Sequence, residues 1–152
     1  MNDSALDSKL AKKIIASLNR ILELELAGVV RYMHYSFMIF GHNRIPIVAW
    51  LRDQSNESNA HAVLAGEHIT AVGGHPSLKI GQLLETHKHD VNEILKEAYH
   101  HEKEGLDEYH VLLGLATGHS ILLEEYARDQ IAAEEMHLAD IRKMMRKPGS
   151  IK

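Results

Sequence analysis

The sequence contains no cysteine and only three prolines among its 152 residues. The absence of cysteine excludes disulfides, thiolate zinc sites, iron–sulfur clusters and cysteine nucleophiles, and it is compatible with a reducing cytosol. The scarcity of proline, together with few glycine clusters, leaves long segments in which a helix can run without interruption.

Long apolar runs are also missing. No stretch of about 18 apolar residues is present, and the most apolar region, residues 26–40, is interrupted by Arg31 and His34. The N-terminal segment MNDSALDSKLAKK is polar and has no apolar signal core. We therefore expect a cytoplasmic protein without a membrane span.

Charge of one sign is not in large excess. The chain has 17 Lys and Arg against 21 Asp and Glu, a net charge of −4, which argues against nucleic acid as the main partner. The length and an apolar content of 45% predict one domain, 1–152, with a single core. Twelve histidines are a first sign of metal chemistry, although histidine also serves as a solvated surface residue.

Apolar side chains recur at steps of three or four residues, which predicts helices and gives no indication of a strand. The four predicted helices cover about 6–39, 46–72, 90–115 and 120–146. Short turns join the first helix to the second and the third to the fourth, whereas a longer connection separates the two pairs. The prediction is an all-α four-helix bundle of two antiparallel hairpins joined by a long crossover, with no clear fifth helix.

Two of the predicted helix starts carry capping signals. Asp90 with Glu93 is a capping pair for the third helix, although that helix could begin as early as Leu83. Ser120 is the predicted cap of the fourth helix.

Glutamates interrupt the apolar stripes of two of these helices. Glu25 lies in the stripe of the first helix and Glu102 in that of the third. Burying a lone carboxylate is costly unless it is paired, protonated or bound to a cation. Each glutamate is followed seven residues later by a tyrosine, Tyr32 or Tyr109. The tyrosine hydroxyls either bond the ligand carboxylates or are satisfied core hydroxyls.

The other two helices each carry a glutamate and a histidine on one face. Glu57 precedes His61 by four residues and Glu134 precedes His137 by three, and residues at these spacings share a helix face. The first carboxylate precedes the histidine by 36 residues in the N-terminal half and by 35 in the C-terminal half. Oxygen-rich ligation with one imidazole per metal suits two iron or manganese ions better than a closed zinc site. The predicted metal ligands, which are also the predicted catalytic set, are Glu25, Glu57, His61, Glu102, Glu134 and His137.

With these residues in place, the chain resembles the bacterioferritins within the ferritin-like superfamily. The matching stretches are Glu25-Leu26-Ala27 with Tyr32, His61-Ala62, Gly73-Gly74-His75-Pro76, Glu102 with Gly105, and Glu134-Glu135-Met136-His137. The resemblance covers nearly the whole chain. It implies a ferritin-like four-helix subunit with a centre of two iron ions. Such a ferroxidase centre oxidises Fe(II) with dioxygen or hydrogen peroxide, and the ferric product is stored as mineral inside a protein shell.

Three features differ from the family's pattern. Bacterioferritins usually place the glutamate of the second helix three residues before the histidine, where this chain has Ser58, and Glu57 is four before. The family's haem is held by a methionine two residues before that histidine; this position is Asn59, so we expect no haem. The chain ends 15 residues after His137, without the family's short fifth helix. We therefore predict a homo-oligomer of at least two subunits and leave a cage open.

Three other functions stay open. A di-iron or di-manganese peroxidase or catalase, similar to rubrerythrin or manganese catalase, would consume peroxide without accumulating metal. A DNA-protecting mini-ferritin would place its iron between subunits, whereas the ligand pattern here is complete within one chain. A structural bundle that has lost its metal is the third alternative.

Several further polar residues are predicted to be solvated. Trp50 is expected in the core or in an interface, and the basic end of the last helix suits the helix dipole. The residues predicted to face solvent are Glu67, His68, His87, His89, His100 and His101. The alternative for Glu67 and His68 is a path for iron, and the alternative for the other four histidines is transient metal binding at an entry point or pore.

Overall fold

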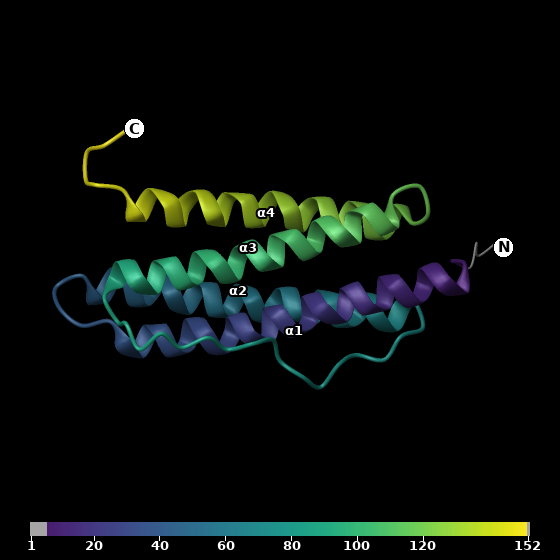
Figure 1. Ribbon diagram of the computed structural model, residues 1–152, viewed down its shortest axis with the longest axis horizontal. Coiled ribbons are helices and arrows are strands. Elements are labelled where there is room, and N and C mark those ends of the chain that lie inside the picture. The colour runs from purple at the N-terminus through teal and green to yellow at the C-terminus, as the bar shows by residue number, and fades with distance from the viewer. Residues whose placement is uncertain (1–5, 152) are drawn as a thin grey trace.

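The computed structural model describes residues 6–151, and within them it contains four helices and no strand. The helices are α1 (Ser8–Met38), α2 (Arg44–Ala71), α3 (Val91–Ala116) and α4 (Ile121–Met145). Figure 1 shows α1–α2 and α3–α4 as two antiparallel hairpins that lie side by side. The predicted all-α bundle with a long crossover is therefore confirmed, and no fifth helix occurs in the described residues. No described helix is long and apolar enough to span a membrane.

The helix starts follow the predicted caps, with one difference. The Asp90 side chain accepts a hydrogen bond from the Asn92 backbone N–H at 2.9 Å, and α3 begins at Val91 rather than near Leu83. Glu93 does not return to Asp90 as the predicted capping pair requires. Its carboxylate instead lies 2.9 Å from the Lys96 ammonium one turn on, and the opposite charge there offers a stronger partner than a neutral N–H.

The cap of α4 also forms as predicted. The Ser120 hydroxyl oxygen accepts a hydrogen bond from the Leu123 backbone N–H at 3.3 Å. Tight turns at 39–43 and 117–120 close the two hairpins, and Gly41 and Gly118 supply the positive φ angles that these turns need. The predicted domain extent of 1–152 stays a prediction, because residues 1–5 and 152 lie outside the described part of the chain.

Two clusters of buried apolar side chains fill the bundle. Members of the first include Ile14, Leu18, Ile69, Leu112 and Leu123. Members of the second include Tyr35, Ile39, Leu51, Ile94 and Ile141. Burial of each Ile or Leu side chain contributes roughly 1.5–3 kcal/mol to folding. The two clusters therefore hold the helices together at two levels along the bundle.

A layer of polar side chains separates the two apolar clusters. On α1 the layer holds Glu25, which lies between Leu22 of the first cluster and Tyr32 of the second. On α2, α3 and α4 the glutamates and histidines of the layer likewise lie between residues of the first cluster and residues of the second. The closely packed helix pairs are α1–α2, α3–α4 and α1–α3. The pair α2–α4 is not among them, and the polar layer bridges these two helices through side chains.

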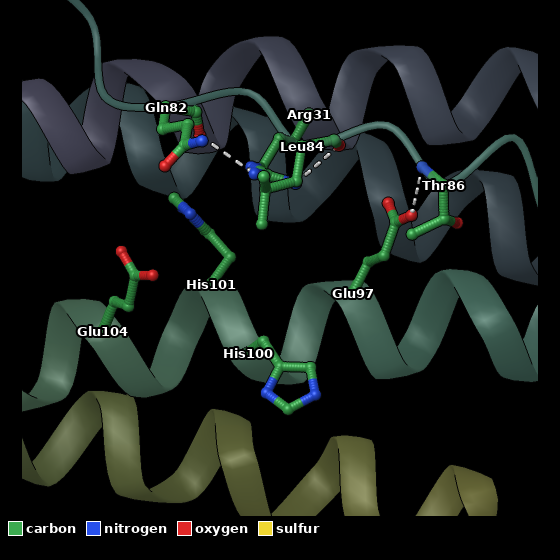
Figure 2. A pocket seen from close by; sticks show the side chains of 8 residues that line it. All are labelled: Arg31, Gln82, Leu84, Thr86, Glu97, His100, His101 and Glu104. Atoms are coloured by element: carbon green, nitrogen blue, oxygen red, sulfur yellow. Dashed lines mark hydrogen bonds between the residues drawn. The ribbon is translucent and has the colours of Figure 1, made fainter.

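The crossover, residues 73–90, runs in an extended path along α1 (Figure 1). Its backbone is held by side chains that recur on one face of that helix. The Asn19 amide donates to the His75 carbonyl at 3.1 Å and accepts from the Ser77 N–H at 2.7 Å. Further along, the Arg31 guanidinium donates to the carbonyls of Gln82 and Leu84, as Figure 2 shows. The crossover is therefore held against α1 by hydrogen bonds, and we call residues 73–90 the strap.

Gly81 lies where the strap comes closest to α1. Its N–H donates to the Glu23 carbonyl at 2.7 Å. A Cβ atom at this position would lie 3.0 Å from that same oxygen and 3.3 Å from the Ala27 Cβ. Only glycine lets the two backbones approach to hydrogen-bonding distance here.

Candidate metal centre

The polar layer brings together all six predicted ligands, although they come from four helices. Glu25 lies on α1, Glu57 and His61 on α2, Glu102 on α3, and Glu134 and His137 on α4. Three of the four carboxylates are almost fully buried, with exposed fractions of 8% for Glu25, 7% for Glu102 and 3% for Glu134. Buried carboxylates are rare without a compensating partner, so this layer is the place to look for bound cations.

The first of two potential ligand groups consists of Glu25, His61 and Glu134. The Nδ1 atom of His61 lies 3.4 Å from a carboxylate oxygen of Glu25 and 3.4 Å from one of Glu134. One donor atom from each residue lies within 4.8 Å of the other two. The three residues come from three helices, so one ion held by them would join α1, α2 and α4.

The second group consists of Glu102, Glu134 and His137, and it shares Glu134 with the first. Its donor atoms also lie within 4.8 Å of one another. The second carboxylate oxygen of Glu134, Oε2, is buried and has no hydrogen-bond partner among the described residues; its ion-pair partner is His137, with Nδ1 at 3.7 Å. An unsatisfied buried carboxylate oxygen is the expected mark of a position that a cation fills. The donor set therefore fits two metal ions.

Two tyrosines orient the carboxylates of the opposite half of the chain. The Tyr109 hydroxyl donates to Glu25 at 2.9 Å, and the Tyr32 hydroxyl donates to Glu102. Both tyrosine rings are fully buried in the flanking apolar clusters. Of the two readings of these tyrosines, the structure supports hydrogen bonding to the predicted ligand carboxylates. A tyrosine from each half of the chain thus positions a carboxylate from the other half.

Burial and mutual repulsion shift the pKa values of the three central carboxylates in different directions. Burial, reinforced by the charge of Glu134, raises the pKa of Glu102 well above its usual value. Burial also raises the pKa of Glu25, against the hydrogen bond from His61. Burial acts in the same direction on Glu134, yet its contacts with Glu102, His137 and His61 outweigh burial and lower its pKa. The layer therefore favours ionisation of Glu134 and disfavours ionisation of Glu25 and Glu102, and a bound cation would reverse the second effect.

The surrounding carboxylates favour the positively charged form of both histidines in the layer. Burial opposes the imidazolium of His61, but the hydrogen bonds with Glu134 and Glu25 outweigh burial and raise its pKa to about 10. The interaction with Glu134 likewise raises the pKa of His137. Protons on these rings take the place of a metal ion's charge, so metal binding to this layer must release protons.

Glu57 takes a different position from the other predicted ligands. Its two carboxylate oxygens lie 3.8 Å from His61 Nε2 and 3.1 Å from His137 Nε2. These are the ring nitrogens that face away from Glu134, and Glu57 belongs to neither of the two ligand groups. A carboxylate that accepts from the far N–H of a metal-binding histidine fixes the ring and its tautomer. The geometry places Glu57 in that supporting position.

Ser58 occupies the position where the family usually has the glutamate of the second helix. Ser58 is buried and packs against α1 at Gly28, where an added Cβ would come within 2.8 Å of its hydroxyl oxygen. The His101 ring lies on the other side of Gly28, with Nε2 3.1 Å from that Cβ position. The small residue at position 28 therefore lets Ser58 and His101 pack closely against α1.

The prediction that His68, His89 and His101 face solvent is wrong, because all three are half-buried, whereas His87 and His100 are exposed as predicted. Burial lowers the pKa of His101 to about 4, because the ring packs between α3 and α1. His68 stacks on Tyr126 with ring centroids 4.2 Å apart. Glu67 is exposed as predicted, and Trp50 packs edge-on against Tyr32 in the second apolar cluster. The sequence pattern did not indicate that His101 packs against α1, because the residue it contacts there, Gly28, has no side chain that would add to an apolar periodicity.

The duplicated carboxylate and histidine layer, with four helices around it, can now be compared with known proteins. The family described as ferritin-like domain matches residues 15–149. The chain belongs to the ferritin-like family. None of the curated proteins matches the sequence significantly.

Two solved structures share the ferritin-like fold of this chain. One carries the description "ferritin like, diiron-carboxylate proteins" from Bacillus anthracis str. Ames, with a TM-score of 0.87 and 23% sequence identity. The similarity covers 92% of this chain and 100% of that chain. The other is a dodecameric thioferritin, the bacterioferritin-related protein from Bacteroides fragilis, with a TM-score of 0.79 and 20% identity. That similarity covers 92% of this chain and 86% of the thioferritin chain.

Proposed function

We propose that this ferritin-like protein is a cytoplasmic ferroxidase that binds two iron ions within one subunit and oxidises Fe(II) with dioxygen or hydrogen peroxide. The observation that supports the proposal most strongly is the pair of buried ligand groups that share Glu134. Bound iron would supply the electrons for reduction of the oxidant. The ligands would be Glu25, His61, Glu102, Glu134 and His137, with Glu57 supporting both histidine rings.

The protein's own groups account for selective binding and for proton movement. Apolar clusters lie on both sides of the layer and three of its carboxylates are buried, so charge interactions among these carboxylates are strong. The Tyr32 and Tyr109 hydroxyls hold Glu102 and Glu25 in place before metal arrives. The raised pKa values of Glu25 and Glu102 mean that cation binding would favour loss of protons from these carboxyls, which offsets part of the added positive charge.

Iron storage or detoxification is the biological role that we propose for this activity, and it requires self-association. Large apolar side chains on the outer surface of α1 and the turn after it favour a homo-oligomer. Val30, Met33 and Phe37 recur on one face of the helix, and Phe40 follows, with exposed fractions between 39% and 74%. The subunits of a dimer or of a larger shell would cover this face.

Oxidation of Fe(II) by metal-free protein in air tests the proposal. We expect a fast increase in ferric absorbance that saturates near two iron ions per chain and disappears in Glu134→Ala. The matched control is Glu135→Ala, which removes the exposed neighbour on the same helix turn and is expected to keep the fast phase. A rate no higher than that of iron without protein would contradict the proposal.

A non-storing di-iron or di-manganese peroxidase or catalase is the second candidate, because the same ligand set would serve either chemistry. Prolonged aerobic loading separates the two functions. Iron accumulation far beyond two ions per chain supports storage, whereas peroxide turnover at a constant metal content supports the peroxidase. A DNA-protecting role is disfavoured, because both ligand groups lie within one chain; a gel shift at low salt checks it.

A further inference from the structure

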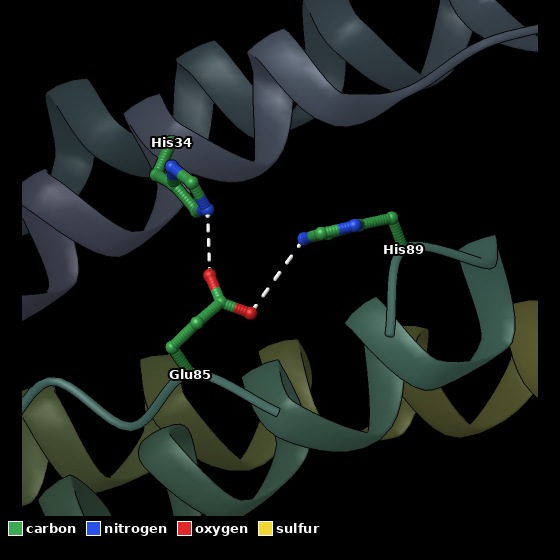
Figure 3. Close-up of side chains that lie close together, drawn as sticks. All are labelled: His34, Glu85 and His89. Carbon is green, nitrogen blue, oxygen red and sulfur yellow. Dashed lines mark hydrogen bonds and ion pairs between the residues drawn. The ribbon is translucent and has the colours of Figure 1, made fainter. Parts of the chain in front are cut away.

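A second group of potential metal ligands lies outside the polar layer, where the strap contacts the C-terminal part of α1. We call it the crossover triad; it consists of His34 from α1 and of Glu85 and His89 from the strap. Figure 3 shows both imidazoles turned toward the carboxylate of Glu85, one from each side. The three residues come from segments 51 residues apart in the chain, so the fold rather than local sequence brings them together.

The distances within the crossover triad suit a small cation. His34 Nε2 lies 2.9 Å from one oxygen of Glu85, and His89 Nε2 lies 3.6 Å from the other. Metal–ligand bonds of about 2.0–2.1 Å put neighbouring ligand atoms of a tetrahedral or octahedral ion roughly 3.0–3.4 Å apart. All three donor atoms lie within 4.8 Å of one another, so small side-chain rotations would close the triad around one ion.

The triad is accessible and its carboxylate is ionised. The side chains of His34, Glu85 and His89 are 45%, 35% and 31% exposed, so an ion can enter from solution and water can complete its coordination. The backbone N–H of His87 donates to Glu85 at 2.6 Å and lowers its pKa. The His87 ring, with Nδ1 4.0 Å from the same carboxylate, lies within reach as a further ligand.

The triad is distinct from the proposed di-iron layer. His34 follows Tyr32 by two residues, which is about 200° around the helix, so it points away from the layer that Tyr32 faces. None of its three residues belongs to either of the buried ligand groups. An experiment can therefore refute metal binding at the crossover triad without refuting the di-iron proposal, and the reverse is also true.

We propose that the crossover triad is a second metal site, which binds one borderline divalent transition-metal ion such as Zn(II) or Fe(II). Two imidazoles and one carboxylate select such ions over Mg²⁺ or Ca²⁺, which prefer oxygen ligands. A bound ion links α1 to the strap and adds to the hydrogen bonds that Arg31 makes with Gln82 and Leu84. Metal availability then controls how firmly the crossover is held to the bundle.

Zinc titration calorimetry on a Glu134→Ala background, which lacks the carboxylate shared by both buried ligand groups, measures this site with the polar layer weakened. We expect about one Zn(II) per chain, and adding His34→Ala with His89→Ala to reduce the affinity at least about tenfold. The matched control adds His110→Ala with His119→Ala instead, which removes two exposed histidines outside the triad and leaves the affinity unchanged. Equal affinity in the triad variant, or an equal loss in the control, would overturn the proposal.

Hydrogen exchange on the otherwise unaltered protein gives an independent readout if the Glu134→Ala background does not fold. Zn(II) is expected to slow amide exchange in residues 82–89 of the wild type and to have no such effect in the His34→Ala, His89→Ala variant. Protection by Zn(II) that is the same in both proteins, or absent from both, would refute a metal site at the triad.

Discussion

Glu134 is the residue at which folding and metal binding impose the most conflicting demands. It is the most deeply buried of the site's carboxylates, its lowered pKa keeps it ionised, and one of its oxygens has no hydrogen-bond partner within residues 6–151. Raised pKa values at His61 and His137 favour the positively charged rings beside Glu134, and raised pKa values at Glu25 and Glu102 disfavour further negative charge there. Cations would replace this arrangement of protons, since they balance the same charge within the layer.

The position of Glu57 leads to a prediction about the Glu57→Gln variant. Because Glu57 faces the Nε2 atoms of both histidines, the amide should leave both metal ions bound and weaken their affinity roughly 10–100-fold. Metal content by elemental analysis and affinity by competition with a chelator measure the two effects separately. Loss of one whole metal ion per chain would show instead that Glu57 is a direct ligand, as the sequence predicted.

Residue types and helical spacing were sufficient to predict the six side chains that the structure brings together in one layer. They could not predict that Glu57 lies on the far side of the histidine rings, because a separation of four residues fixes the helix face but not the direction of the side chain. They also missed the structural role of Arg31. Its partners are backbone carbonyls of the strap, and these have no sequence signature.

At the scale of secondary-structure elements, the crossover depends on α1 for most of its contacts. The strap follows one face of α1 from Asn19 through Glu23 to Arg31 and His34. Apolar periodicity and the capping residues predicted the four helices to within a few residues. The path of the strap was not predictable, because its hydrogen bonds with α1 join positions more than fifty residues apart and its residues have no period.

The close approach at Gly81 leads to a prediction at this scale. Gly81→Ala places a methyl group 3.0 Å from the Glu23 carbonyl and is expected to destabilise the protein by about 1–3 kcal/mol through overpacking. Gly114→Ala, in α3 with nothing within 4 Å of the added methyl, is the control. It is expected to stabilise by about 0.5–1 kcal/mol, because alanine favours the helix. Urea denaturation measures both variants, and equal midpoints would contradict the account of the strap.

At the scale of the whole molecule, folding stability should depend on pH because of the polar layer. The pKa of His61 is raised from 6.5 to about 10, so the stability that its charge contributes is complete below pH 6.5 and is lost as the pH rises toward 10. The raised pKa values of Glu25 and Glu102 act with the same sign. We expect the Tm of metal-free protein to fall by several degrees across this range.

Glu134→Gln is the control for this pH dependence, because it removes the anion that holds the proton on His61. Its Tm is expected to change less between pH 6.5 and 10 than that of the wild type, as measured by circular dichroism. A flat profile in metal-free wild-type protein would contradict the protonation states assigned to the layer.

Self-association is the second prediction for the whole molecule. Phe37→Glu with Phe40→Glu puts charge on the exposed apolar face of α1 and is expected to reduce the oligomer to smaller species in sedimentation velocity. Glu104→Gln on the exposed surface of α3 serves as the control and should leave the oligomer unchanged. A wild-type monomer, or an oligomer unaffected by the double substitution, would rule out this face as the subunit interface.

The central claim is that the polar layer of one subunit binds two iron ions. The most direct test is anomalous scattering at the iron edge from crystals of this protein soaked anaerobically with Fe(II). The account predicts two peaks in the layer, one among Glu25, His61 and Glu134 and the other among Glu102, Glu134 and His137. An empty layer, or a single peak that leaves one of these groups without metal, would contradict it.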